Sequence, residues 1–182
     1  MIINKTINIV AISGSLKSNS ANTNILRALI KMAPENVIIK IADNLDALPH
    51  FNPETKEEIV SVFNLRQQLR ESNAVIFSTP EYAFGVPGVL KNALDWLVSS
   101  GELNEKPVAA ISASPLFLGG DKALASLLLT LKALGTNMNE DSSLSIGNIK
   151  NKMNEAGEII DGETIQSLKS ILNNLLKTIS LH

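Results

Sequence analysis

The sequence predicts an α/β fold in which five parallel strands form one sheet with helices on both faces, a three-layer sandwich. Short runs rich in β-branched residues alternate along the chain with longer runs whose apolar residues recur at helical spacing. The length of 182 residues suits one domain that buries about 70% of the surface exposed by its unfolded chain. Polar loops that contain glycine follow two of the strands. We therefore expect residues 1–182 to form a single domain with right-handed crossovers.

The first expected strand covers residues 7–12 (INIVAI) and ends at a turn that contains Gly14. A helix should follow, with Ser20 or Asn22 as its N-cap and Pro34 marking its end. Its apolar residues recur at helical spacing and are Ile25, Leu26, Leu29, Ile30 and Ala33. Residues 37–42 (VIIKIA) form the second expected strand.

The second expected helix begins at a capping box formed by Thr55 and Glu58. Residues 74–77 are the third expected strand, and the next helix should begin at Pro87, whose missing N–H has no partner in a first turn anyway. Residues 107–112 form the fourth strand. The strongly apolar helix after it is marked by Leu124, Leu127, Leu128, Leu131 and Leu134.

The fifth strand is expected within residues 136–146, which are polar enough to favour the edge of the sheet. Residues 148–162 are charged and contain glycine, which indicates a mobile excursion. An amphipathic helix should close the chain, with Ile165, Leu168, Leu172, Leu175 and Ile179 on one side.

Composition excludes several functional classes. A net charge of −2 argues against nucleic-acid binding, which needs clustered Lys and Arg. The absence of cysteine excludes disulfides, thiolate catalysis and cysteine-based metal sites. With only two histidines, His50 and His182, we expect no metal centre and no Ser/His/Asp triad. No apolar run reaches the roughly 18 residues of a membrane helix and no signal peptide is visible, so we expect a cytoplasmic protein without membrane contact.

Three loops should meet at one edge of the sheet, because the carboxyl ends of parallel strands share an edge. The first loop, residues 14–22 (GSLKSNSAN), offers Ser15, Lys17, Ser20 and Asn22 at the positive start of a helix. Hydroxyl, amide and ammonium donors beside a helix N-terminus suit a phosphate group. The alternative is that these residues only cap the helix.

The second loop lies within residues 78–96 (STPEYAFGVPGVLKNALDW), where a strand passes directly to a helix. Tyr82 and Phe84 lie close together in a chain that is only 4% aromatic, which favours contact with a flat ring system. The alternative is packing in the core or at a subunit interface. Glu81 is more typical of a solvated loop carboxylate than of a base, and Trp96 is expected to pack.

The third loop, residues 112–120 (SASPLFLGG), supplies Ser114 and two glycines that allow a ring to approach the backbone. Other phosphate sites are excluded by residue identity. A dinucleotide fingerprint needs two further glycines after Gly14, and a P-loop needs Gly-Lys-Ser/Thr. A response regulator would need aspartates where Ile12 and Ser13 stand. The loops thus predict a small ligand with a phosphate.

With these motifs, the chain resembles the NADPH-dependent FMN reductase family, the flavodoxin-like group that includes chromate, azo-dye and quinone reductases. The similar phosphate-loop positions are Gly14, Ser15, Leu16, Lys17, Ser20 and Asn22. In the second loop, which we call the ring loop, and the helix after it, the similar positions are Pro80, Glu81, Tyr82, Val86, Pro87, Gly88 and residues 90–96. Ala113-Ser114-Pro115 and the glycine pair look like the third flavin-contacting loop.

The resemblance implies a flavodoxin-like fold and a bound FMN. The implied cofactor contacts are Ser15, Lys17, Ser20, Ala21, Asn22, Pro80, Glu81, Tyr82, Ala83, Phe84 and Ser114. The chain departs from the family pattern at Lys17, where arginine is common, and at Ala83 and Gly85, which replace the frequent Asn and Ser. Lysine makes a point-charge contact with the phosphate in place of a bidentate one. The second loop is left with only its backbone N–H groups to meet the flavin ring.

The implied activity is an oxidoreductase that passes a hydride from NADPH or NADH through FMN to a quinone, another small acceptor or flavin itself. The flavin carries this chemistry, so no catalytic acid or base is expected from the chain. The resemblance also implies a homodimer or homotetramer. One rival function is a flavodoxin-like electron carrier. Such carriers usually have a strongly acidic docking surface, so the net charge of −2 argues against this function. Another rival is a binding module that holds no FMN.

Overall fold

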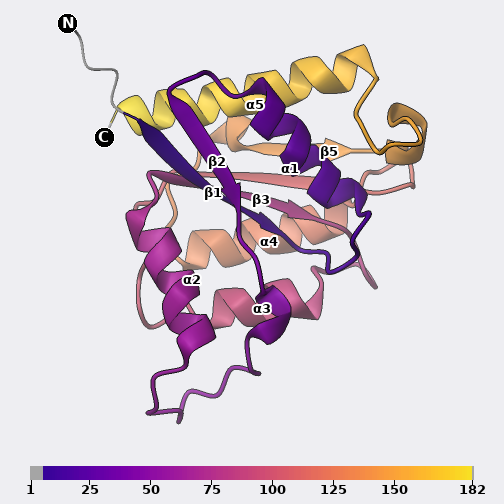
Figure 1. Cartoon of the computed structure of the whole chain (residues 1–182). Coiled ribbons are helices and arrows are strands. Elements are labelled where there is room, and N and C mark those ends of the chain that lie inside the picture. The colour runs from indigo at the N-terminus through magenta and orange to yellow at the C-terminus, as the bar shows by residue number, and fades with distance from the viewer. Residues whose placement is uncertain (1–5, 182) are drawn as a thin grey trace, which may run out of the picture.

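The computed structural model describes residues 6–181, and strands alternate with helices along the whole of that range (Figure 1). The strands are β1 (Ile7–Ser13), β2 (Val37–Ile41), β3 (Ala74–Thr79), β4 (Val108–Ala113) and β5 (Ser143–Ile146). The helices are α1 (Ala21–Met32), α2 (Val60–Glu71), α3 (Gly88–Asp95), α4 (Asp121–Ala133) and α5 (Gly162–Ser180). His182, one of the two histidines, lies outside the described residues.

The five strands form one parallel sheet in the order β2-β1-β3-β4-β5, which confirms the predicted fold class. Strand β5 is at the edge, as its polar sequence predicts, but it pairs with β4 over Ser143–Ile146 only. The chain moves outward from β1 in both directions, so the order of strands reverses between β1 and β3. Ligands bind at such reversal points, beyond the carboxyl ends of the strands.

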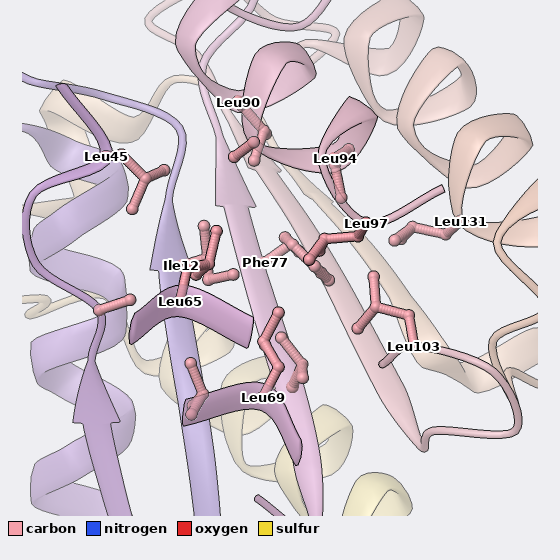
Figure 2. Close-up of a cluster of buried hydrophobic side chains, with 14 of the residues drawn as sticks. Ile12, Leu45, Leu65, Leu69, Phe77, Leu90, Leu94, Leu97, Leu103 and Leu131 are labelled. Carbon is pink, nitrogen blue, oxygen red and sulfur yellow. The ribbon is translucent and has the colours of Figure 1, made fainter. Parts of the chain in front are cut away.

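Each central strand is buried on both faces, which explains why its sequence is continuously apolar. Helices α1 and α5 cover one face, and α2, α3 and α4 cover the other (Figure 1). Ile12 and Phe77 face the α2 side, where Figure 2 shows leucines of α2, α3 and α4 converging on them. Burying a side chain of this size contributes about 1.5–3 kcal/mol. This packing holds the central strands rigidly, so the loops extend from a fixed edge of the sheet.

The predicted capping box of α2 is wrong, because the helix begins only at Val60 and its N-cap Ile59 makes no side-chain bond. The backbone N–H of Thr55 instead donates to the carbonyl of Asn52 at 3.1 Å. The Asn52 side chain also accepts from the backbone of Glu54 at 3.0 Å, which is the local turn that asparagine favours. This turn uses the backbone N–H of Thr55, which the capping box would need for the Glu58 side chain.

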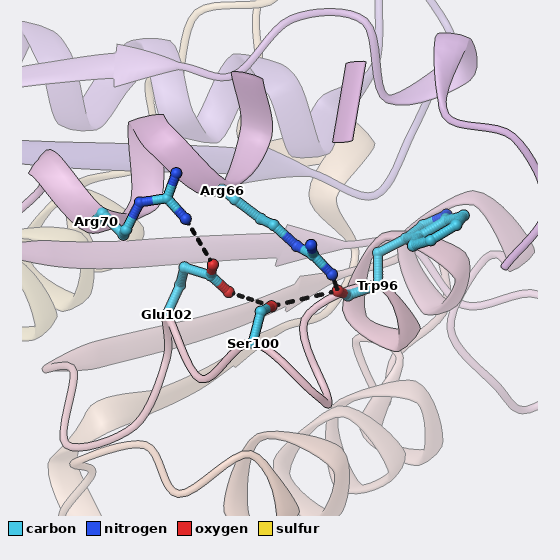
Figure 3. Close-up of polar contacts among 5 residues, drawn as sticks. All are labelled: Arg66, Arg70, Trp96, Ser100 and Glu102. Carbon is cyan, nitrogen blue, oxygen red and sulfur yellow. Dashed lines mark hydrogen bonds and ion pairs between the residues drawn. The ribbon is translucent and has the colours of Figure 1, made fainter. Parts of the chain in front are cut away.

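The segment after α3 is tied to α2 by a polar network (Figure 3). Arg66 donates to the carbonyl oxygen of Trp96 at 2.6 Å, while Arg70 pairs at 2.9 Å with the buried carboxylate of Glu102. Ser100 donates to the other oxygen of Glu102. The Trp96 ring is buried and its Nε1 donates to a backbone carbonyl, which confirms its packing role.

Residues 148–161 are packed against α1 and are not a detached excursion. They contain a short 3-10 helix (Ile149–Lys152) and a turn in which the N–H of Asn154 donates to Glu158 at 3.0 Å. Ile149 and Ile159 are buried with α1 and α5. Its charged residues also take part in this packing, because Glu158 pairs with Lys31 of α1.

Candidate functional site

The loops after β1, β3 and β4 border a cavity of about 370 Å³ at the carboxyl edge of the sheet. All but two of the predicted cofactor contacts line it. These residues are Ser15, Lys17, Ser20, Ala21, Asn22, Pro80, Glu81, Tyr82 and Ser114. Two predicted contacts, Ala83 and Phe84, lie outside the lining. Sequence reasoning thus brings together residues that are up to 99 positions apart, from Ser15 to Ser114.

The start of α1 presents an open hydroxyl to the cavity. Ser20 is the N-cap, with extended backbone dihedrals of −92° and 133°, yet its side chain makes no capping hydrogen bond. The first-turn N–H groups of a helix have no partner within the helix and carry partial positive charge. Lys17 is exposed at the rim. This end of the cavity therefore offers a hydroxyl, a cation and helix N–H groups to an anion.

Asn22 is a structural bridge below the cavity. Its side chain is buried, donates to the carbonyl of Ala113 at 3.2 Å and accepts from the Ser78 hydroxyl at 3.0 Å. Asn22 therefore connects the ends of β3 and β4 to the first turn of α1. Its amide group is occupied by these contacts, so its contribution to an anion site comes from the backbone N–H.

The ring loop makes a tight turn at its tip. Tyr82 and Gly85 exchange two backbone hydrogen bonds of 3.0 Å each, and the central residues Ala83 and Phe84 have φ values of 48° and 60°. Positive φ at both central positions defines a type I′ turn, which normally uses Asn or Gly. Each such non-glycine residue costs of the order of 1 kcal/mol. The Phe84 side chain is 77% exposed at the tip, so it does not pack into this chain's core.

Glu81 connects the ring loop to α4. One of its carboxylate oxygens accepts a hydrogen bond of 3.0 Å from the backbone N–H of Ala123 in the first turn of α4. The helix has Gly120 at its own N-cap and so has no capping side chain there. Gly120 has a φ of 83°, and a Cβ at this position would lie 3.3 Å from the Cβ of Glu81. The carboxylate thus fixes the second loop relative to the third.

The third loop is folded on itself by Ser114, whose hydroxyl accepts from the N–H of Leu116 at 3.1 Å. Beyond it, Leu116, Phe117 and Leu118 are 61–81% exposed. Three consecutive exposed apolar residues beside a cavity are unusual for a solvated surface.

The segment after β5 also lines the cavity, and sequence reasoning missed it. Its lining residues are Ile149, Lys150, Met153, Asn154, Glu155 and Gly157. The signal was available, since β5 was predicted as a strand of a parallel sheet and the loop after it must lie at the same edge. Lys150 adds a second cation and Glu155 a carboxylate to the cavity.

A second cavity of about 580 Å³ lies between α2, the end of α3 and residues 51–59. It is lined by aromatic side chains and by Arg66 and Arg70, which hold the Trp96 carbonyl and Glu102. Within residues 6–181, no group of three His, Cys, Asp or Glu side chains could hold a metal ion. No helix in this range has both the length and the apolar character required to cross a membrane.

Residues 7–151 match the family model described as NADPH-dependent FMN reductase. A quinone reductase from Escherichia coli K12 is 31% identical over 175 residues, which cover 91% of this chain and 92% of the relative. An NAD(P)H-dependent FMN reductase from Pseudomonas aeruginosa is 30% identical over 177 residues and covers 93% of each chain.

The fold is similar to that of FerB, a flavoenzyme NAD(P)H:(acceptor) oxidoreductase from Paracoccus denitrificans. The TM-score is 0.88 at 28% identity, and the match covers 97% of this chain and 99% of that one. The similarity therefore extends over nearly the whole of both chains.

Proposed function

The chain belongs to the NADPH-dependent FMN reductase family, and from this premise we propose that it transfers electrons from NAD(P)H through FMN to a quinone or another small acceptor. The observation that carries the proposal is the cavity at the β1/β3 reversal point, lined by loops of the family form. Bound FMN would supply the redox chemistry, which is acceptance of a hydride from NAD(P)H and delivery of electrons to the acceptor. The chain itself binds and orients the cofactor and shields it from water.

The phosphate end of the cavity fits the cofactor. A phosphate needs several donors and positive potential, and the start of α1 supplies the Ser20 hydroxyl, helix N–H groups and the Lys17 ammonium. Ser15 and Ala21 complete this end. We assign the phosphate to these residues.

The ring end of the cavity supplies shape and backbone groups. Pro80, Glu81 and Tyr82 line it from the second loop and Ser114 from the third. Glu81 acts through the start of α4, to which it is hydrogen-bonded, and not as a base. We also propose that Ala83 and Phe84 contact the flavin ring or a neighbouring subunit. The tight turn places both residues at the tip of the ring loop.

The exposed apolar rim supports a homodimer or homotetramer. Its members are Leu16, Tyr82, Phe84, Leu116, Phe117 and Leu118, all at least 60% exposed. A rim of this kind is typical of a surface that another protein chain covers. Light scattering after gel filtration tests the assembly. We also propose that the full chain forms one domain. A further proposal is that the protein is cytoplasmic, and cell fractionation tests this location.

The central experiment is a visible spectrum of the purified protein, before and after incubation with excess FMN. We expect flavin absorption, and its absence in both samples would contradict every FMN-based function. Anaerobic addition of NADPH or NADH should then bleach the flavin. A flavin that stays oxidised with both nucleotides would support the rival electron carrier, which the relatives named as reductases do not favour. A panel of quinones and other acceptors then identifies the substrate.

A further inference from the structure

The segment after β5, residues 148–157, forms a wall of the cofactor cavity in addition to the three loops. We call it the β5 wall. Ile149 is buried, and its backbone N–H donates to the carbonyl of Ser114 in the third loop at 3.1 Å. The N–H of Asn148 donates to the carbonyl of Leu116, also at 3.1 Å. One end of the β5 wall is thus attached to the third loop through the backbone, so a change of side chain at position 150 leaves this attachment in place.

The other end of the β5 wall lies against the first loop and α1. Gly157 has a φ of 78°, and a Cβ there would lie 2.2 Å from the side-chain nitrogen of Asn24, so only glycine allows this approach. The same nitrogen donates to the side-chain oxygen of Asn19 at 3.0 Å. Asn19, Asn24 and Gly157 all line the cavity. The β5 wall therefore extends from the third loop to the start of α1, where we place the phosphate.

Four charged residues line the cavity, and two of them belong to the β5 wall. The carboxylate of Glu81 is hydrogen-bonded to the start of α4. Lys17, Lys150 and Glu155 are exposed, and none of the three forms an ion pair with another residue in the range 6–181. Lys150 and Glu155 also lie outside the motifs that carry the family resemblance. The β5 wall therefore brings one cation and one carboxylate to the cavity, and the charges of both remain available to a ligand.

We propose that Lys150 is a second cation for the FMN phosphate and that Glu155 opposes it; this inference rests on the proposed function, which gives the cavity its FMN. The phosphate is the charged group of FMN near neutral pH, so the free charges of the cavity act mainly on it. Lys17 stands where the family pattern commonly has arginine, so the first loop offers a point charge in place of a bidentate contact. Lys150 supplies a further charge and further N–H donors.

The test compares FMN with riboflavin, which has the same ring and ribityl chain but no phosphate. Fluorescence titration of the flavin-free protein measures both dissociation constants. We expect Lys150→Met, which removes the charge and keeps most of the side-chain length, to weaken FMN binding about tenfold and to leave riboflavin binding unchanged. Lys150→Arg should retain most of the FMN affinity. Glu155→Gln should strengthen FMN binding about threefold, again with riboflavin binding unchanged.

The matched controls are Lys169→Met on α5 and Glu35→Gln between α1 and β2. Both residues are exposed and neither lines the cavity, so both variants should keep the wild-type affinity for each flavin. Ionic strength gives a second measurement. Added salt should reduce the difference in FMN affinity between wild type and Lys150→Met, because counterions screen exposed charges.

Equal FMN affinity of wild type and Lys150→Met would overturn the proposal. An equal loss of riboflavin affinity would also overturn it, because Lys150 would then act on the ring, the ribityl chain or the fold. FMN affinity that does not rise in Glu155→Gln would remove the opposing role of Glu155. Binding needs no turnover, so if FMN binds but neither NADPH nor NADH reduces it, the proposed function fails and the affinities still decide the role of Lys150. A wild-type protein that binds neither flavin contradicts both.

Discussion

Helices α1 and α5 cover the same face of the sheet but begin in different ways. At the start of α5, Asp161 caps the helix by accepting from the backbone N–H of Thr164 at 2.9 Å and from its hydroxyl at 2.6 Å. At the start of α1, Ser20 occupies the same position and makes no capping bond. The α5 start is satisfied by its own side chain, whereas the α1 start leaves its donors open to the cavity.

The difference separates a helix start that stabilises the fold from one that is available to a ligand. A capping side chain contributes about 0.5–2 kcal/mol, so an uncapped start is a cost that a bound anion can offset. Helix α4 is a third case, because it is capped from another loop by Glu81. Substitutions at these three helix starts test the distinction.

The largest effect is expected for Asn22→Ala, which removes the bridge under the start of α1. The Ser78 hydroxyl and the Ala113 carbonyl, both buried, would lose their partner, so the free energy of unfolding should fall by about 2–3 kcal/mol. Urea denaturation of the FMN-free protein measures it. Asn64→Ala on the exposed side of α2 is the matched control and should change little. Equal stability of the two variants would show that the bridge contributes nothing.

Glu81→Ala should have the next largest effect, because it removes the cap that the ring loop gives to α4. We expect a loss of about 1–2 kcal/mol in unfolding free energy and weaker FMN binding, since two loops of the cavity become independent. Glu81→Gln keeps an acceptor oxygen and should recover most of both. If the glutamine variant is as weak as the alanine variant, the carboxylate charge matters and the hydrogen bond alone does not explain its role.

Ser20→Ala should weaken FMN binding about tenfold without changing stability, because its hydroxyl makes no capping bond. Fluorescence quenching of FMN on titration with the protein measures the affinity. Ser18→Ala, in the same loop but outside the cofactor cavity, is the control. Unchanged FMN affinity in both Ser20→Ala and Lys17→Ala would remove the phosphate assignment.

Asp161→Ala should show the opposite behaviour, with a Tm lower by about 2–4 °C and unchanged FMN affinity. The hydrogen bonds from the Thr164 hydroxyl and N–H lower the pKa of Asp161. Its stabilisation is therefore present above the ordinary aspartate pKa and is lost as the pH falls through the lowered value. Thermal melts between pH 2 and 7 should show wild type and Asp161→Ala converging at the acid end. A constant difference in Tm across that range would rule out this linkage.

Much of the fold and most of the site could be predicted because their signals are local. The alternation of strand and helix patterns predicted the sheet, and the loops at 14–22, 80–82 and 114 predicted most of the cavity. The predicted start of α2 was wrong because the turn at Asn52 takes the Thr55 N–H that the capping box would need. The lining by residues 149–157 was missed because their charge and glycine content indicated a mobile excursion, although a loop that follows a fifth parallel strand lies at the same edge.

The amino-acid sequence by itself determined the order of elements, the two-sided burial of the central strands and the residue types at the cofactor edge. These follow from periodicity and residue chemistry, which act over short stretches of chain. Tertiary structure alone decided which of those residues remain free: Asn22 and Glu81 are occupied by partners more than 40 positions away, whereas the Ser20 hydroxyl makes no capping bond. Hydrogen-bond partners are chosen by proximity in space, so the same residue type holds the fold at one position and is open to a ligand at another.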